Sequence, residues 1–453
     1  MRFKIGLSAT IPLVLTLGLA ACGGGDDDSG GGTAAKPTNC TNKIVHEDAK
    51  RVLVWAWYPN MAKVVDNFNN KNTDVQVCWT NAGQGQPEYA KFQTAISAKK
   101  GAPDVIMLEA DQLVGFEIQE ALVDLAPYGA NDVKAKFSAG AWKDVSQGDK
   151  VFAAPVDGGP MALIYRTDVF EKYGIKTPPK TWDEYAADAK KVKDAGGPVF
   201  GDFGSNVPAV TTALMIQKGA QPFVYDLSDK QNITIKLDDQ ATKDVLDYWG
   251  NLSKQGLVGK EDQFTTDYIA GMVGGKYATY VSAAWAPGYL TGAGVGAGKD
   301  KGKFAVAPLP QWDVNNPVSV NWGGSAFAVT TQASDKAAAA KVALGLYADD
   351  ASLTDGWKTQ TIFPLNQSVL KSDEFVNAKV DFFNGQTVNK DIYVPAENAY
   401  KGAVYSPFTV YYYAQLQAQI TKILNGQTTG DQAATDLQNQ IVTYAKSQGF
   451  TVH

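Results

Sequence analysis

Short apolar strands alternate with amphipathic helices along most of the chain. Residues 52–57 are continuously apolar, as expected of a strand that is buried on both faces of a parallel sheet. A helix is predicted over residues 61–71, where Val64, Val65 and Phe68 lie on one stripe. Parallel strands need long crossover connections, and helices between the strands supply them. The alternation therefore predicts an α/β fold.

The same alternation continues towards the C-terminus. Further strands are predicted at residues 75–79, 104–108, 161–165, 277–283, 304–307 and 323–330. Further helices are predicted at residues 88–100, 112–122, 181–197, 241–254, 335–347, 408–424 and 431–448. Thr181 and Glu184 have the spacing of a capping box at the start of one of these helices.

The length and the order of these elements indicate two lobes that exchange segments. A chain of 453 residues is too long for one core, yet no linker-like break follows residue 44. The strand and helix predicted after Trp322 have the same pattern as those of the first lobe, which suggests that the chain returns to it. We therefore expect a first lobe and a second lobe, each with a mainly parallel sheet, made respectively of residues 44–156 with 321–366 and residues 157–320 with 367–453.

The N-terminus has the pattern of a lipoprotein signal. A basic tip precedes a short apolar run, and small residues come directly before Cys22. We expect residues 1–21 to be removed, Cys22 to carry lipid, and residues 22–43 to form a flexible Gly-rich tether. An ordinary secretory signal is the alternative. The protein is expected outside the cytoplasm, in a periplasm or on the outer face of the cytoplasmic membrane.

Cysteine use and charge narrow the possible partners. In an oxidising compartment, Cys40 and Cys78 predict a disulfide that adds about 3–4 kcal/mol of stability, and two free thiols are the alternative. Only two histidines and no paired Cys motif are present, so we expect neither a metal nor a cofactor. The net charge of −6 argues against a nucleic-acid partner.

Candidate binding residues follow the predicted strands of the first lobe. In open α/β sheets, ligands bind beyond the carboxyl ends of the strands. Trp57 and Tyr58 end the first strand, Gln84 follows the second, and Glu109 and Asp111 follow the third. Aromatic faces, amides and carboxylates together are suited to a sugar, whose C–H faces stack on rings and whose hydroxyls bond to polar groups.

A second group of candidates comes from later segments. Asp157 lies between glycines and prolines at an expected turn and crossover, Trp285 follows a strand, and Trp322 and Gly323 lie where the chain re-enters the first lobe. Tyr405 and the tyrosines at 411–413 are equally suited to the rim of the binding site or to the hydrophobic core. Other tryptophans, in helical or capping patterns, are expected to be structural: Trp142, Trp182 and Trp249.

Several segments together resemble a known family. They are residues 102–106 (APDVI), 155–168 (PVDGGPMALIYRTD), 179–184 (PKTWDE), 275–285 (GKYATYVSAAW) and 307–310 (APLP). In order and spacing, the chain is similar to the extracellular solute-binding proteins of sugar ABC transporters, which include maltose-binding protein. The resemblance implies two α/β lobes that clamp a ligand, a membrane permease as partner, and a monomer without catalytic activity. It also places a ligand contact near Asn206.

Two other functions remain open from the residues alone. A secreted glycoside hydrolase would use a pair of carboxylates, which Glu109, Asp111 and Asp157 could supply. A binding protein for polyamines would also use aromatic and acidic residues, whereas phosphate would favour arginine and Gly-rich helix starts. Tryptophans recur among the candidates and arginines do not cluster there, which favours a neutral sugar, expected to be an oligosaccharide, while a polyamine remains the alternative.

Overall fold

The computed structural model describes residues 39–453, in which strands and helices alternate as the sequence predicts. The strands are β1 (Lys50–Trp55), β2 (Val75–Thr80), β3 (Val105–Glu109), β4 (Ser146–Gln147), β5 (Lys150–Val151), β6 (Ala154–Arg166), β7 (Gly201–Asp202), β8 (Phe223–Tyr225), β9 (Asn232–Ile235), β10 (Val258–Gly259), β11 (Thr279–Ala283), β12 (Phe304–Pro308), β13 (Asn321–Val329), β14 (Phe363–Pro364) and β15 (Thr451–Val452).

The predicted helices are present, although the one predicted at residues 112–122 spans Ala110–Glu117, and further helices of up to 11 residues were not predicted. The helices are α1 (Met61–Lys71), α2 (Gln86–Ala98), α3 (Ala110–Glu117), α4 (Ala139–Val145), α5 (Thr167–Lys172), α6 (Trp182–Asp194), α7 (Pro208–Lys218), α8 (Gln240–Lys254), α9 (Thr266–Val273), α10 (Ala286–Gly292), α11 (Lys336–Gly345), α12 (Asp350–Thr359), α13 (Gln367–Leu370), α14 (Asp373–Val376), α15 (Val394–Ala399), α16 (Thr409–Leu424) and α17 (Gly430–Ser447).

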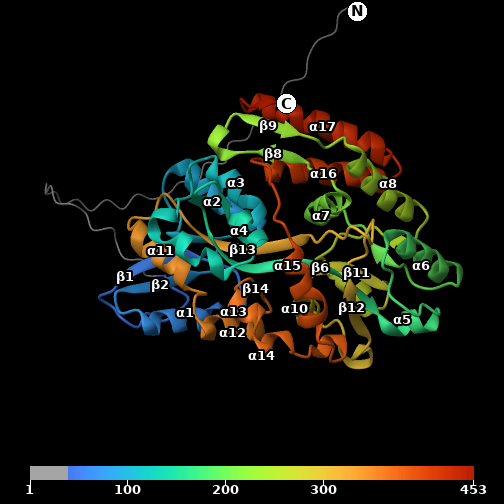
Figure 1. Ribbon diagram of the computed structural model, residues 1–453, viewed down its shortest axis with the longest axis horizontal. Coiled ribbons are helices and arrows are strands. Elements are labelled where there is room, and N and C mark those ends of the chain that lie inside the picture. Colours follow the sequence, from blue (N-terminus) through green and yellow to red (C-terminus); the bar gives the residue numbers. More distant parts are fainter. Residues whose placement is uncertain (1–38) are drawn as a thin grey trace, which may run out of the picture. The chain divides into compact units, whose positions relative to one another are not determined.

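Two long strands, β6 and β13, connect the parts of the main sheet. The strand order is β11-β6-β13-β3-β1-β2, and β12 and β14 also pair with β6. The first part of β6 pairs with β13 and β14, and its second part, from Met161, pairs with β11 and β12. In Figure 1, β6 and β13 run side by side through the middle of the described chain. The fold is α/β and two-lobed, as the sequence predicts.

The expectation of mainly parallel pairing needs a correction. Strand β1 pairs in parallel with β2 and β3, but β13 runs antiparallel to both β3 and β6, and β11 and β12 run antiparallel to β6. The reason is the path of the chain, because β6 leaves the first part of the sheet and β13 returns to it. The sheet is therefore mixed.

A second correction concerns the segment from Pro155 to Pro160. It was expected to form a turn, and it is instead the extended first half of β6. Opposite it, the register of β13 shifts between Asn321 and Gly324, so Trp322 and Gly323 form a bulge. A Cβ atom on Gly159 would lie 1.9 Å from the carbonyl oxygen of Trp322. Only glycine fits this crossing of the two strands.

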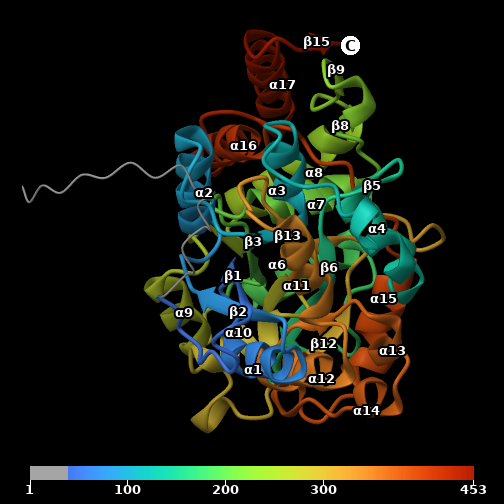
Figure 2. The same cartoon turned by 90° about the vertical axis from the view of Figure 1, so that its left-hand side faces the viewer.

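Helices cover the sheet with the apolar faces that the sequence predicts. Helix α1 buries Met61, Val64, Val65 and Phe68, and it packs against β2 and α12 (Figure 2). Helix α11 contacts β1, β3 and β13, while α16 packs against α7, α8 and α17. Thr181 caps α6 by accepting a hydrogen bond from the backbone N–H of Glu184 at 3.0 Å. The Glu184 carboxylate accepts from Lys180 N–H.

The start of the described chain is attached to the edge of the main sheet. Cys40 and Cys78 form a disulfide, which joins this segment to β2. The Asn42 side chain accepts from Trp79 N–H at 2.7 Å and donates to the carbonyl of Val77 at 2.9 Å. The proposed signal and Cys22 lie outside the described residues.

We predict that Gly159→Ala destabilises the protein, because the added methyl group overlaps the Trp322 carbonyl. Overpacking of this kind costs about 1–3 kcal/mol in the free energy of unfolding, which denaturant titration measures. Gly292→Ala is the matched control, since a Cβ there meets nothing within 4 Å. If the two variants unfolded at the same denaturant concentration, the close crossing of β6 and β13 would be wrong.

Candidate ligand-binding site

A small cavity lies where the first turn of α3 meets β13, α7 and α16. Its volume is about 40 Å³. By volume this holds a few water molecules rather than a sugar ring. Its lining residues are Glu109, Ala110, Asp111, Ala209, Thr212, Ala213, Ile216, Val320, Asn321, Trp322, Gly323, Tyr400, Ala403, Tyr405 and Tyr413. Admission of a larger ligand therefore requires these walls to separate.

Two carboxylates line this cavity at the carboxyl end of β3. Glu109 accepts a hydrogen bond from the Tyr89 hydroxyl at 2.9 Å. Asp111 accepts from the Tyr413 hydroxyl and from the Gln112 amide, each at 2.8 Å. Burial, followed by the nearby charge of Asp111, raises the pKa of Glu109 to about 8. Burial also raises the pKa of Asp111.

A third carboxylate, Asp157, lies on β6, two strands from β3 with β13 between them. It is buried on β6, where its Oδ1 atom accepts from the Tyr58 hydroxyl at 2.9 Å and from Ser325 N–H at 2.7 Å. Burial raises its pKa to about 6 despite these two donors. Asp157 lines a second cavity of about 20 Å³, which shares Ala110, Asn321 and Gly323 with the first.

Four aromatic side chains form a cluster beside the first cavity. The Trp285 indole N–H donates to the Trp322 carbonyl at 2.9 Å, and the two rings meet edge to face with centroids 4.7 Å apart. Phe264 packs against both rings and against Tyr289. Trp322 is the member that lines the cavity. The bulge in β13 thus sets the position of an aromatic wall.

The structure brings together some of the sequence-predicted residues and separates others. Glu109, Asp111, Trp322 and Gly323 line the first cavity, and Asp157 and Gly323 line the second. The remaining candidates line neither cavity: Trp57, Tyr58, Gln84, Asn206 and Trp285.

Each of these remaining side chains has a defined place. Trp57 packs edge to face on Tyr89, and Tyr58 is buried with its hydroxyl on Asp157. Gln84 is exposed. The Asn206 amide holds the backbone of Gln263, donating to its carbonyl at 2.8 Å and accepting from its N–H at 2.9 Å.

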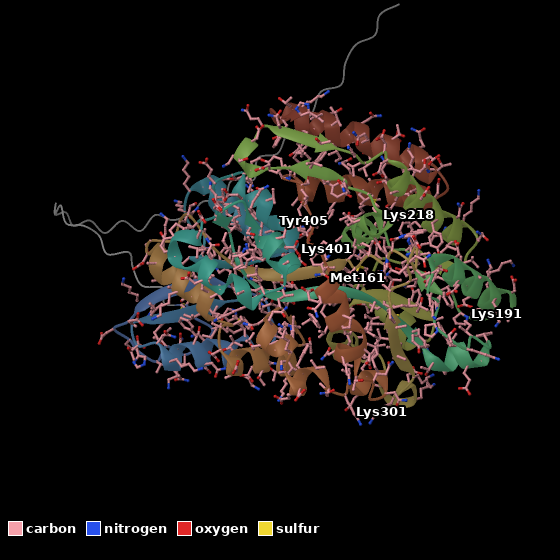
Figure 3. All side chains as sticks on the ribbon, in the orientation of Figure 1. Met161, Lys191, Lys218, Lys301, Lys401 and Tyr405 are labelled. Carbon is pink, nitrogen blue, oxygen red and sulfur yellow. A yellow bond between two sulfur atoms is a disulfide. The ribbon has the colours of Figure 1, made fainter. Side chains whose placement is uncertain are left out.

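Sequence reasoning did not single out several lining residues. Tyr400 and Asn321 belong to this group, as does Thr212 on α7. Helix α7 was not predicted, although Pro208 at its first position is a typical start signal. Asn321 directly precedes the recognised Trp322, but a single polar residue carries little signal. Tyr405, labelled in Figure 3, and Tyr413 were considered for the rim and line the cavity.

Residues 39–453 contain no group of three or more His, Cys, Asp or Glu side chains placed to hold a metal ion. Within the same range, no helix combines the length and apolar character needed to span a membrane.

Comparison with known proteins identifies the family. Bacterial extracellular solute-binding proteins match over residues 56–359, and the chain belongs to this family. The fold is similar to that of the ABC transporter associated binding protein from Bifidobacterium animalis subsp. lactis Bl-04, solved in complex with β-1,6-galactobiose. The TM-score is 0.76 and the identity 29%, covering 89% of this chain and 100% of that one.

Two relatives found by sequence comparison match either at lower identity over a long stretch or at higher identity over a short one. The arabinooligosaccharide-binding protein of Bacillus subtilis is 24% identical over 306 residues, which cover 65% of this chain and 67% of the relative. A binding protein of Brucella abortus is 34% identical over 111 residues, or 24% of this chain. The chain spans only about a quarter (27%) of the length of that relative.

We predict that the ligand-free protein loses stability as the pH rises from 5 to 8. Burial raises the pKa of Glu109 to about 8 and that of Asp157 to about 6, so the folded state retains protons that the unfolded chain has already released. The stabilisation is complete below the unfolded pKa and is lost as the pH passes the folded pKa. Melting temperatures across this range measure the slope.

Two variants test the contribution of the cavity to this slope. Glu109→Gln is expected to make the slope shallower, because the amide does not titrate, and other buried carboxyls with a raised pKa, such as Glu88 and Asp202, should keep part of it. Asp66→Asn, on the exposed face of α1, removes the same charge away from the cavity and should retain the slope. A melting temperature that rises from pH 5 to 8 would contradict the electrostatics of the site.

Proposed function

We propose that this protein captures a sugar between its two lobes and delivers it to the permease of an ABC transporter. The single observation that carries the proposal is the composition of the first cavity. Carboxylates, an amide and aromatic faces meet there, and these groups bind hydroxyls and the C–H faces of sugar rings. Two relatives support the choice, since their names specify β-1,6-galactobiose and arabinooligosaccharides. An oligosaccharide is the proposed ligand.

The proposed mechanism is a shift between open and closed states. We assign residues 44–156 with 321–366 to the first lobe and residues 157–320 with 367–453 to the second. The cavity then lies between Glu109 and Asp111 on one side and α7 and Tyr413 on the other. The hydrogen bond from Tyr413 to Asp111 joins the two sides and would break on opening. A ligand that contacts both sides only when they are close stabilises the closed state by that difference in affinity.

The proposed binding residues keep distinct roles in this mechanism. Trp322 supplies a ring face, and Glu109 and Asp111 accept hydrogen bonds from the ligand. Trp57, Gln84, Asn206 and Trp285 are proposed to contact the ligand from the surrounding walls when the lobes close on it. Tyr58 and Asp157 support the floor through their mutual hydrogen bond. The protein is proposed to act as a monomer and to release its ligand unchanged.

A thermal-melt screen of residues 39–453 tests this function. The panel contains mono-, di- and oligosaccharides together with polyamines, because a ligand that binds only the folded state raises the melting temperature. We expect one saccharide series to raise it, and the sugar to be recovered intact. Trp322→Ala should weaken that binding by about 1–3 kcal/mol, the burial value of a large side chain.

The outcomes of the screen separate the alternatives. A response to polyamines alone would contradict the sugar function. Shortened oligosaccharides in the recovered ligand would show a hydrolase instead. Gly292→Ala serves as the control for Trp322→Ala, since its site is open and lies outside the cavity. If Trp322→Ala and the wild type bound the sugar with equal affinity, the Trp322 ring would not contact the ligand.

We also propose that a lipid on Cys22 holds the protein at the outer face of a membrane. The support is the sequence pattern before Cys22 together with membership of an extracellular family. When the full chain is expressed in a bacterium, Cys22→Ala should move it from the membrane fraction to the soluble extracytoplasmic fraction. Metabolic labelling with a fatty acid should disappear in the same variant. Unchanged fractionation and labelling would contradict the anchor.

A further inference from the structure

The carboxylates of the first cavity are bonded only by neutral donors in the described structure. Glu109 takes its side-chain hydrogen bond from the Tyr89 hydroxyl. Asp111 takes its bonds from the Tyr413 hydroxyl and the Gln112 amide. The ion pairs found within residues 39–453 involve other carboxylates. The cavity thus gathers carboxyl groups that pair with no described protein cation.

One buried carboxylate elsewhere is paired with a cation, whereas Asp157 and Glu397, like the carboxylates of the first cavity, have neutral donors. Asp300 is buried, and Arg166, which is also buried, lies 3.1 Å from it. Around the first cavity, by contrast, the described lining residues include no lysine, arginine or histidine. Lys401, which is labelled in Figure 3, directly follows the lining residue Tyr400. Its side chain is exposed and is not part of the cavity wall. Burial of an unpaired charge is costly, so a cation from outside would favour the ionised form of these carboxyl groups.

A third group in the wall also needs a donor. The Oδ1 atom of Asn321 is buried and has no hydrogen-bond partner, while its amide nitrogen donates to Glu397 at 3.3 Å. Asn321 lines the cavity together with Glu109 and Asp111. A buried acceptor without a partner costs free energy until a ligand satisfies it. The wall is therefore rich in acceptors and calls for a ligand rich in donors.

The remaining walls are suited to a ring that carries positive charge. Tyr400, Tyr405, Tyr413 and Trp322 all line the cavity. Aromatic faces attract cations as well as the C–H faces of sugars. An ammonium group offers three donors and no acceptor, which complements two carboxylates and an amide oxygen.

From these observations we propose that the preferred ligand is an amine-bearing saccharide whose ammonium group binds between Glu109 and Asp111. This inference rests on the proposed sugar-binding function and specifies the class of sugar. The ammonium group would replace the neutral donors as the partner of the carboxylates, and the sugar ring would lie against Trp322 and the tyrosines.

Isothermal titration calorimetry with matched sugars tests the inference. Glucosamine, N-acetylglucosamine and glucose differ only at C2, as do the three galactose counterparts, and the β-1,4-linked glucosamine disaccharide can be compared with its acetylated form and cellobiose. At pH 6.5 and low salt, we expect the amine member to bind at least about tenfold more tightly than its neutral counterparts. The advantage should shrink as salt is added.

Variants and proton counting make the result specific to the carboxylates. Glu109→Gln and Asp111→Asn should each remove most of the amine preference, whereas Asp66→Asn on α1 should retain it. Burial raises the pKa of Glu109 to about 8, so binding of an ammonium group at pH 6.5 should displace a proton into the buffer. Titrations in buffers of different ionisation enthalpy measure this release.

The possible outcomes separate this inference from the function beneath it. If neutral sugars bind as tightly as their amines, or if a neutral sugar from the melt screen binds while every amine fails, the amine inference is overturned and the sugar function stands. If spermidine binds and no saccharide does, both are overturned. An amine preference that Glu109→Gln and Asp111→Asn leave intact would also overturn the assignment to this cavity.

Discussion

The crossing of β6 and β13 at Gly159 is the constraint on which the rest of the structure depends. The backbone of Trp322 occupies the place of a side chain at Gly159, so the two strands approach more closely than any other residue would allow. The same bulge turns Trp322 towards the first cavity and leaves its carbonyl to accept from Trp285. One local packing requirement therefore links the path of the chain between the lobes to the position of the aromatic wall.

Electrostatics gives the site its second property. Glu109, Asp111 and Asp157 are gathered at the carboxyl ends and the centre of the sheet, where burial raises the pKa of each. Tyrosine hydroxyls and the backbone N–H of Ser325 donate hydrogen bonds to them, and no ion pair described in residues 39–453 includes them. Burying these carboxyl groups lowers the stability of the folded protein, and it leaves hydrogen-bond acceptors that a ligand can satisfy. Strained or costly groups of this kind are commonly found at functional sites.

The sequence predicted the parts of the fold that depend on local pattern. The stripe of Val64, Val65 and Phe68 gave helix α1, and the rule for strand ends placed Glu109 and Asp111 at the cavity. Features set by distant pairing were not predictable in the same way. The direction of β13 and the extended form of β6 at Asp157 depend on where the chain returns, and the contact of Tyr413 with Asp111 joins residues 302 positions apart. No local pattern near Tyr400 or Asn321 indicated that they would share this cavity.

A crystal structure of residues 39–453 grown with the sugar selected by the melt screen would test the central claim most directly. We predict that the sugar lies against Trp322 with polar groups on Glu109 and Asp111, and that it contacts residues of α7 or α16 on the other side. The walls should also stand further apart than the cavity of about 40 Å³ allows. A sugar bound elsewhere, or held by one side alone, would contradict capture between the two lobes.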